Sequence, residues 1–95
     1  MSNSDSYQKF RELLNENYQF PCIYLHKIIG KASEPFSVSL AVFESKFIGL
    51  KKTIERKSAS GQHLSLTFEY HAASADDVIL LVEETRKLAD LLYIL

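Results

Sequence analysis

The chain has 95 residues, of which 46% are hydrophobic and 24% charged, the usage of an ordinary globular domain, and this excludes a disordered chain. This length accommodates one hydrophobic core without disulfides or metals, and it leaves no room for a second core. The formal net charge of -1 provides no overall field toward nucleic acid or an anionic membrane, so partners must be argued from local features.

The sequence favours a reducing compartment. Cys22 is the single cysteine and has no partner for an internal disulfide, and residues 1–10 lack the basic start and apolar run of a secretory signal. The longest unbroken aliphatic run, residues 78–82, is too short to span a bilayer. We therefore expect a cytoplasmic protein that makes no membrane contact.

The first predicted helix covers residues 7–15, where apolar side chains recur at helical spacing. Asp5 or Ser6 is available to cap its N-terminus. We assign residues 1–19 to a polar, mobile N-terminus with this short helix, and residues 20–95 to a single domain.

Residues 22–29 are predicted to form an interior strand, because both of their alternating sets contain apolar side chains. Spacing alone leaves open which set faces the helices. Gly30 is expected to end this strand, and residues 33–35 are typical of a helix start. The helix that follows should bury one stripe, formed by Phe36, Leu40, Phe43 and Phe47. Gly49 is its predicted stop.

Residues 50–57 are predicted to form an amphipathic edge strand, in which basic side chains discourage pairing with other molecules. These basic side chains are Lys51, Lys52, Arg56 and Lys57. After turn residues at 58–61, apolar and polar side chains alternate from Leu64 to His71, the pattern of a strand buried on one face. We expect this to be a central strand with its apolar side chains, Phe68 and Tyr70 included, pointing inward.

The last predicted helix begins at Ser74, which forms a capping box with Asp77. Its apolar face is expected to be buried, while Glu83, Glu84 and their basic neighbours stay in water. Residues 91–95 are too apolar for a loose tail, so they should form a final strand in the sheet.

This order predicts an α+β fold of the ferredoxin-like βαββαβ type, preceded by the short N-terminal helix. Its four-stranded antiparallel sheet has the first and third strands at the centre and two helices covering one face. The other face of the sheet stays open.

Three short features resemble the YbeD-like family, small bacterial proteins of unknown function with an ACT-like version of this fold. They are Phe20-Pro21 before the first strand, residues 27–30 at its end, and Ser60-Gly61 leading to Ser65. The resemblance covers residues 10–95. It implies a role in binding, since ACT-like domains commonly bind small effectors, often amino acids, or pair with another chain to regulate an enzyme.

Nothing in the sequence forms a catalytic or metal-binding constellation. His63 and His71 lie on one strand at about 26 Å from each other, too far to share a metal. We interpret the histidines, His26 included, as surface or partly buried residues. Cys22 is interpreted as a packed small hydrophobe, and the hydroxyl side chains lack a matching histidine and acid. We therefore expect no enzyme activity and no cofactor.

Three surfaces are candidates for binding. Gly30, Lys31 and Ser33 connect the first strand to its helix, where the resemblance implies an effector site and helix N–H groups are suited to a carboxylate. A mixed polar and apolar patch on the open sheet face would suit another protein or a second copy of the chain. It is formed by Lys27, Ser65, Thr67 and Glu69. The basic edge at residues 51–57 is the third candidate and would bind nucleic acid.

We therefore expect a regulatory or adaptor module that contacts a protein partner, or a homodimer formed through the sheet. A small-effector sensor that uses the Gly30 loop is the first alternative. A weak nucleic-acid binder that uses the basic edge is the second, and it is disfavoured because the aromatic residues of the central strand should point inward.

Overall fold

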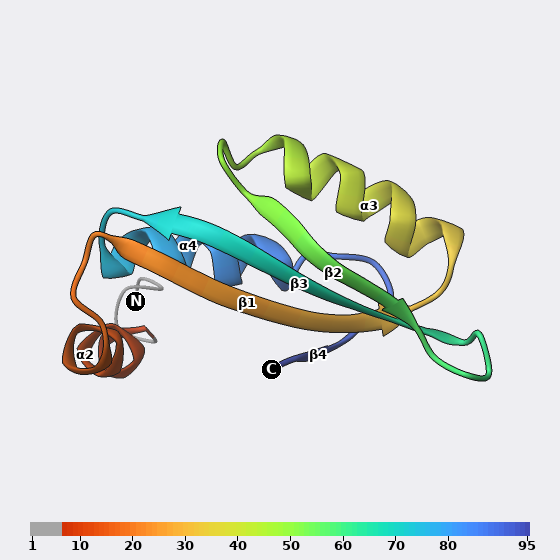
Figure 1. Ribbon diagram of the computed structural model, residues 1–95, viewed down its shortest axis with the longest axis horizontal. Coiled ribbons are helices and arrows are strands. Elements are labelled where there is room, and N and C mark those ends of the chain that lie inside the picture. The colour runs from red at the N-terminus through yellow and green to blue at the C-terminus, as the bar shows by residue number, and fades with distance from the viewer. Residues whose placement is uncertain (1–6) are drawn as a thin grey trace.

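The computed structural model describes residues 7–95 and consists of a four-stranded antiparallel sheet with helices on one face (Figure 1). The strand order is β2-β3-β1-β4, which places β1 (Cys22–Lys31) and β3 (His63–Ala72) at the centre as predicted. β2 (Lys51–Lys57) and β4 (Leu91–Ile94) form the edges. This arrangement is consistent with a ferredoxin-like fold.

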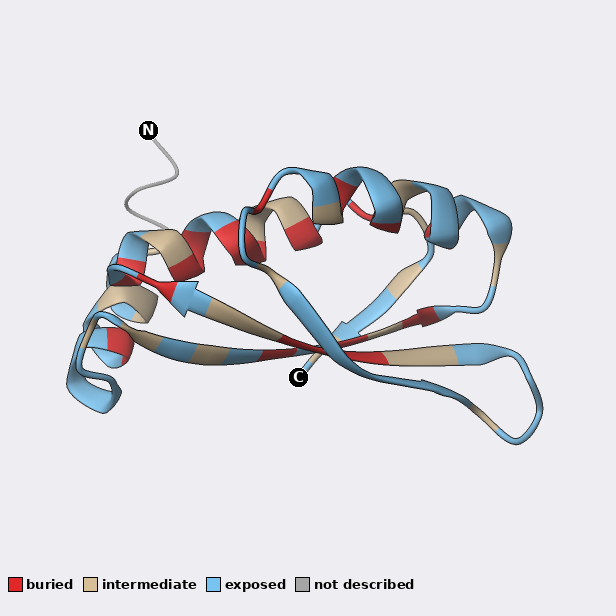
Figure 2. Cartoon of the chain, turned by 45° about the horizontal axis from the view of Figure 1, so that its top comes forward, coloured by how far each residue is buried: buried red, intermediate tan, exposed pale blue. Residues whose placement is uncertain are grey.

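The helices α3 (Glu34–Ser45) and α4 (Ala75–Thr85) cover the same face of the sheet, and the residues buried between the two layers lie on their inner sides (Figure 2). A shorter helix, α2 (Gln8–Asn17), lies beside the sheet. None of the helices in residues 7–95 has the length and apolarity needed to cross a membrane.

In β3 the predicted alternation is confirmed. Leu66 and Phe68 are fully buried, and Leu64 and Tyr70 pack against the same core cluster. Its hairpin partner β2 is an edge strand as predicted, but it is not amphipathic, since every residue in it is exposed. On the helix side of β2, Lys52 pairs with Glu55 and lies 4.0 Å from Glu44 of α3, and β2 contributes no side chain to the core.

The facing of β1 is resolved by its burial pattern. His26 and Ile28 are buried beneath the helices, with Tyr24 packed against the same core, while the alternate set points to the open face. The strand runs past Gly30 to Lys31, so the predicted end at Gly30 was wrong. A Cβ atom on Gly30 would lie 2.5 Å from the ring of Phe36, so glycine is required here for close packing of β1 against α3.

Ser33 is the N-cap of α3, and its Oγ accepts a hydrogen bond from the Phe36 backbone N–H at 3.3 Å. The predicted apolar stripe is buried along its whole length, from Phe36 to Phe47. The helix ends at Ser45, before Gly49, and Gly49 instead occupies the following turn with a φ of 82°.

Ser74 is the N-cap of α4, as predicted, but the capping box is not formed. The Ser74 side chain makes no cap hydrogen bond, and the Asp77 carboxylate accepts instead from the backbone N–H of Ala73 at 2.8 Å. Two acidic residues in the first turn, Asp76 and Asp77, still favour the helix start through the helix dipole.

The N-cap of α2 is Tyr7, and the predicted caps Asp5 and Ser6 lie outside the described residues, as does the expected mobile N-terminus. The helix packs against α4, where Arg11 pairs with Asp76 at 2.8 Å and Leu14 is buried. α2 therefore adds to the core beside the sheet.

The core consists of two clusters. The first cluster lies between the sheet and both α3 and α4, and it includes Phe36, Phe68 and Leu81. The second cluster joins α4 to α2 and includes Leu14 and Val78. Three half-buried side chains pack against both clusters: Tyr24, Tyr70 and Ile94.

Candidate functional site

The open face of the sheet is formed by the strand side chains that point away from α3 and α4. The partner-surface candidates meet there in cross-strand pairs: Lys27 with Thr67, Ser65 with Ile29, and Glu69 with Leu25. Lys27 therefore faces outward, as the partner-surface hypothesis required.

The side of the open face formed by β1 and β4 is mostly apolar, with Lys27 as its charged member. Ile23 and Leu25 are 59% and 58% exposed, although both are large aliphatic side chains. Tyr93 lies opposite Ile29, and Leu95 continues the ladder by donating its backbone N–H to the Lys27 carbonyl at 2.8 Å. We call this group of five side chains the apolar strip: Ile23, Leu25, Ile29, Tyr93 and Leu95.

The side of the open face formed by β3 and β2 is more polar. Ser65 and Glu69 are partly exposed, but Thr67 is only 7% exposed, so its predicted place on the accessible surface was wrong. Thr67 sits at the centre of the sheet, with Lys27 on one neighbouring strand and Ile54 on the other. These longer side chains flank the shorter threonine, which leaves Lys27, Ser65 and Glu69 as accessible members of the predicted patch.

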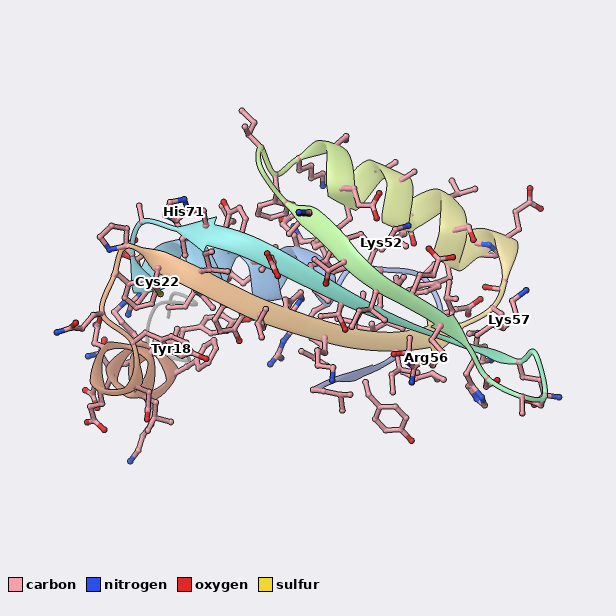
Figure 3. All side chains as sticks on the ribbon, in the orientation of Figure 1. Tyr18, Cys22, Lys52, Arg56, Lys57 and His71 are labelled. Carbon is pink, nitrogen blue, oxygen red and sulfur yellow. The ribbon has the colours of Figure 1, made fainter. Side chains whose placement is uncertain are left out.

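The four basic side chains of β2 do not form one patch. The ladder with β3 shifts register between Lys52 and Ile54, so that Lys51 and Arg56 share the open face while Lys52 and Lys57 point to the helix side. Figure 3 shows Lys52, Arg56 and Lys57 spread along the strand. A hydrogen bond to Glu55, with the charge of Glu44 nearby, raises the pKa of Lys52, which is thus already partnered.

The loop after β1 is tied down by its own side chains. Ser33 Oγ donates to Asp90 Oδ2 at 2.7 Å while it caps Phe36, and the Lys31 backbone N–H donates to the Asp90 carbonyl at 3.0 Å. The Asp90 carboxylate thus already binds the hydroxyl of Ser33, one of the three residues predicted for the effector site. A cavity of about 220 Å³ adjoins Ser33 and is lined partly by Glu55 and Lys57, but Gly30 and Lys31 do not line it.

His26 is fully buried, so its interpretation as a surface or partly buried residue was wrong. The Thr85 hydroxyl donates to the Leu81 carbonyl at 2.7 Å, and it is therefore free to accept from His26 Nε2 at 2.9 Å. This assigns the proton of the neutral ring to Nε2, and Nδ1 has no partner among the described residues. Burial lowers the pKa of His26 to about 4, because a charged ring would be desolvated.

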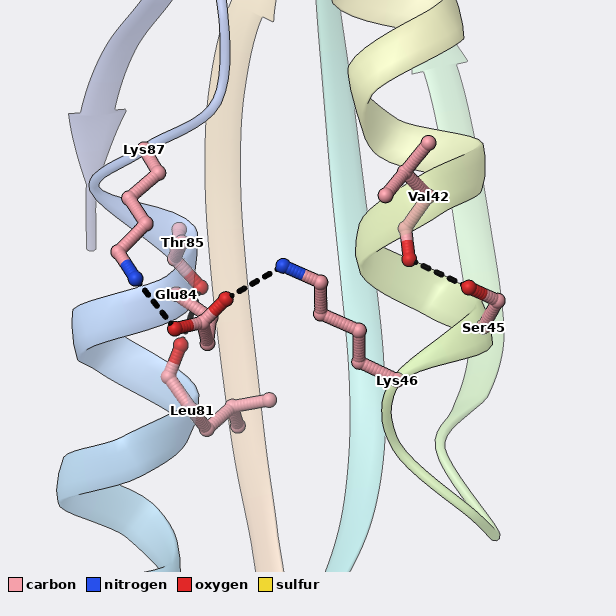
Figure 4. Close-up of polar contacts among 7 residues, drawn as sticks. All are labelled: Val42, Ser45, Lys46, Leu81, Glu84, Thr85 and Lys87. Atoms are coloured by element: carbon pink, nitrogen blue, oxygen red, sulfur yellow. Dashed lines mark hydrogen bonds and ion pairs between the residues drawn. The ribbon is translucent and has the colours of Figure 1, made fainter.

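Glu84 bridges α4 to the end of α3 (Figure 4). Its carboxylate accepts from Lys46 at 2.8 Å and from Lys87 at 2.7 Å, and these two hydrogen bonds lower the pKa of Glu84 to about 2. The side chain is only 15% exposed, so the expectation that Glu84 stays in water was wrong. Glu84 is shielded from water because Lys46 and Lys87 hold its carboxylate between the two helices.

No three His, Cys, Asp or Glu side chains within residues 7–95 are grouped so that they could hold a metal ion. His63 and His71 are exposed at opposite ends of β3. Cys22 is half-buried at the start of β1, at the same end of the sheet as His71 (Figure 3).

A groove beside β1 was not predicted from the sequence. One part, of about 530 Å³, lies between α2 and Tyr24, and an adjoining part of about 350 Å³ is lined by Tyr24, Val82, Arg86 and residues at the end of β4. Phe10 and Tyr24 line both parts. The aromatic residues of the predicted first helix were the only available signal, and helical spacing does not tell which surface a helix covers.

Comparison with family models gives a match to "Protein of unknown function (DUF493)" over residues 15–95. Comparisons with curated proteins and with solved structures gave no match.

Proposed function

The chain belongs to the DUF493 family of proteins of unknown function, and from this premise we propose that it is a non-catalytic adaptor or regulatory module that binds a protein partner through the open face of its sheet. The observation that carries this proposal is the apolar strip. Its Ile23 and Leu25 are large aliphatic side chains, each more than half exposed, on adjacent outward positions of one strand. Exposed aliphatic side chains gathered on one face in this way are typical of interfaces.

The polar groups beside the strip support a specific contact. Lys27 lies within the strip, and Ser65 and Glu69 border it on β3. An apolar centre with polar groups at its border is the usual anatomy of a protein interface. The module is proposed to work in the cytoplasm, in keeping with its single, unpaired cysteine.

The finer fold assignment is also a proposal. A match to a family of unknown function is compatible with the YbeD-like resemblance, and the strand order is that expected of an ACT-like domain. The effector-sensor alternative is less favoured, because Ser33, in the loop that it requires, already donates a hydrogen bond to Asp90 from the segment before β4. The nucleic-acid alternative is disfavoured because Phe68 is buried and the basic residues of β2 point to two faces.

The test is affinity capture from cytoplasmic extract with the wild-type protein and two variants. Leu25→Lys places a charge in the apolar strip, and Val38→Lys places the same charge on α3, at a side chain that is 59% exposed against 58% for Leu25. We expect one protein to be retained in stoichiometric amount at low and high salt by wild type and Val38→Lys. Leu25→Lys should reduce its retention at least about tenfold, the effect of a charge buried without a partner.

A protein retained equally by both variants would place the contact elsewhere and contradict the proposal. Sedimentation equilibrium of the purified protein supplies the second measurement. A dimer that Leu25→Lys dissociates would show that the open face binds a second copy, and the adaptor role would then be wrong.

A further inference from the structure

We infer that the partner is bound as an added β-strand, an acidic extended peptide that pairs with the free edge of β1 at residues 22–26. This inference rests on the proposed function and names the mode of binding. It starts from the unequal lengths of two neighbouring strands, since β1 has 10 residues and β4 has 4. β4 pairs with β1 only from Ile28 to Gly30, and Leu95 extends the ladder no further than Lys27.

The backbone groups left open can be identified. In a strand, the N–H and C=O of one residue point to the same edge, and successive residues alternate. The Lys27 carbonyl accepts from Leu95 and the Lys31 N–H donates to Asp90, so the odd-numbered residues of β1 face the β4 edge. Ile23 and Leu25 therefore present their N–H and C=O groups on this edge, and they have no backbone partner there among the described residues.

An unpaired strand edge is a template for another strand. Figure 1 shows α2 and β4 along the same side of β1, near its two ends. Two residues bound the free part of this strand edge, Tyr18 and Leu95. The Tyr18 ring packs in a T-shaped arrangement against Tyr24, with 5.6 Å between the ring centroids, and Leu95 pairs with Lys27. Neither α2 nor β4 forms backbone hydrogen bonds with Ile23 or Leu25 on this edge.

The surroundings fit the side chains of such a strand on both faces. Side chains that point to the helix layer would enter the part of the groove, about 350 Å³, lined by Tyr24, Val82 and Ile94. Side chains that point the other way would lie beside Leu25 in the apolar strip. Large apolar side chains are therefore expected at successive positions of the peptide.

Charge selects an acidic peptide. Arg86 lines the groove, with its guanidinium 5.9 Å from the Tyr7 ring centroid, and Lys27 lies on the opposite face of the edge. Within residues 7–95, neither side chain pairs with a carboxylate. A carboxylate flanking the apolar positions of the peptide would meet one of these two cations.

The experiment selects random nine-residue peptides displayed on phage against the full-length protein, and a synthetic copy of the most enriched sequence is then titrated. We expect enriched sequences to combine aliphatic residues with Asp or Glu. In the complex, the backbone amides of Ile23 and Leu25 should exchange with solvent at least about tenfold more slowly, as expected for newly formed hydrogen bonds. Unchanged exchange at both amides, or no enriched peptide, would overturn the inference.

Two pairs of variants separate the backbone from the side chains. Leu25→Ala and Leu25→Pro both remove the leucine side chain, but only proline also removes the N–H, and proline is tolerated at a strand edge. Leu25→Pro should bind the peptide about tenfold more weakly than Leu25→Ala, and equal affinities would contradict strand addition. Arg86→Glu should weaken binding at least about tenfold, whereas Lys9→Glu, the same charge change at an exposed position, should not.

These results distinguish this inference from the proposed function. If Leu25→Lys abolishes capture of the protein partner while the Ile23 and Leu25 amides stay unprotected in its complex, the open face binds through side chains alone. The adaptor role would then stand and strand addition would be wrong. If the amides are protected by the acidic peptide but no cellular protein depends on Leu25, the edge binds peptides and the adaptor role fails.

Discussion

Acidification from pH 6.5 to pH 4 is expected to lower the free energy of unfolding by about 3 kcal/mol through His26 alone. The unfolded chain takes up a proton at His26 near its ordinary pKa of 6.5, whereas the folded protein does so only near pH 4. Stability from this group is therefore complete above pH 6.5 and is lost as the pH falls toward 4. Urea unfolding followed by circular dichroism at half-unit intervals measures this change.

The His26→Leu variant removes the titrating ring and should flatten the stability profile between pH 6.5 and pH 4 relative to wild type. His71→Leu is the matched control, because His71 is exposed on β3, and its profile should follow that of wild type. Carboxylates that titrate in this range are present in all three proteins, so the difference isolates His26. A His26→Leu profile as steep as that of wild type would contradict the burial of a neutral ring against Thr85.

Gly30→Ala is expected to destabilise the fold by about 1–3 kcal/mol, because the added methyl would overlap the Phe36 ring at the junction of β1 and α3. The added methyl group would belong to β1 and the ring to α3, and the Phe36 side chain is fully buried. Neither group can therefore move away without displacing the core around it. Thermal and urea unfolding of the purified variant measure the change.

A second substitution tests the cause. Phe36→Leu makes room beside residue 30, so the double variant should be at least about 1 kcal/mol more stable than the sum of the single effects predicts. Gly61→Ala is the control, because Gly61 has a φ of 77° and no atom within 4 Å of an added Cβ. The stability lost in Gly61→Ala comes from backbone conformation, so Phe36→Leu should not restore that stability. Strict additivity in the Gly30 pair would exclude the proposed overlap.

Periodicity was sufficient to predict the order of the elements from residue 8 onward. The apolar stripe that begins at Phe36 in α3 and the alternation of β3 each place apolar residues on one side, so their facing follows from burial alone. β1 has apolar side chains in both alternating sets, and its facing was settled only by tertiary packing. The burial of His26 could therefore not be predicted, because its hydrogen-bond partner, Thr85, is 59 residues away in sequence.

The candidate site was predictable only in part. That Lys27 and Ser65 lie on the same face follows once β1 and β3 are paired in register. The burial of Thr67, in contrast, requires side chains from both neighbouring strands, Lys27 of β1 and Ile54 of β2. The basic side chains of β2 point to two faces because of the register shift near Lys52, and no residue pattern predicts that shift. The free edge of β1 depends on the register in which β4 pairs with β1, and the residue pattern does not define that register.

Tyr24, Tyr70 and Ile94 are partly buried side chains that pack against both clusters of the core. α4 also spans both clusters, with Leu81 in the first and Val78 in the second, so we expect the two clusters to unfold together. Tyr24 and Ile94 also line the groove beside the free edge of β1. A ligand in that groove would contact side chains that belong to both clusters, and it would therefore stabilise the two clusters together.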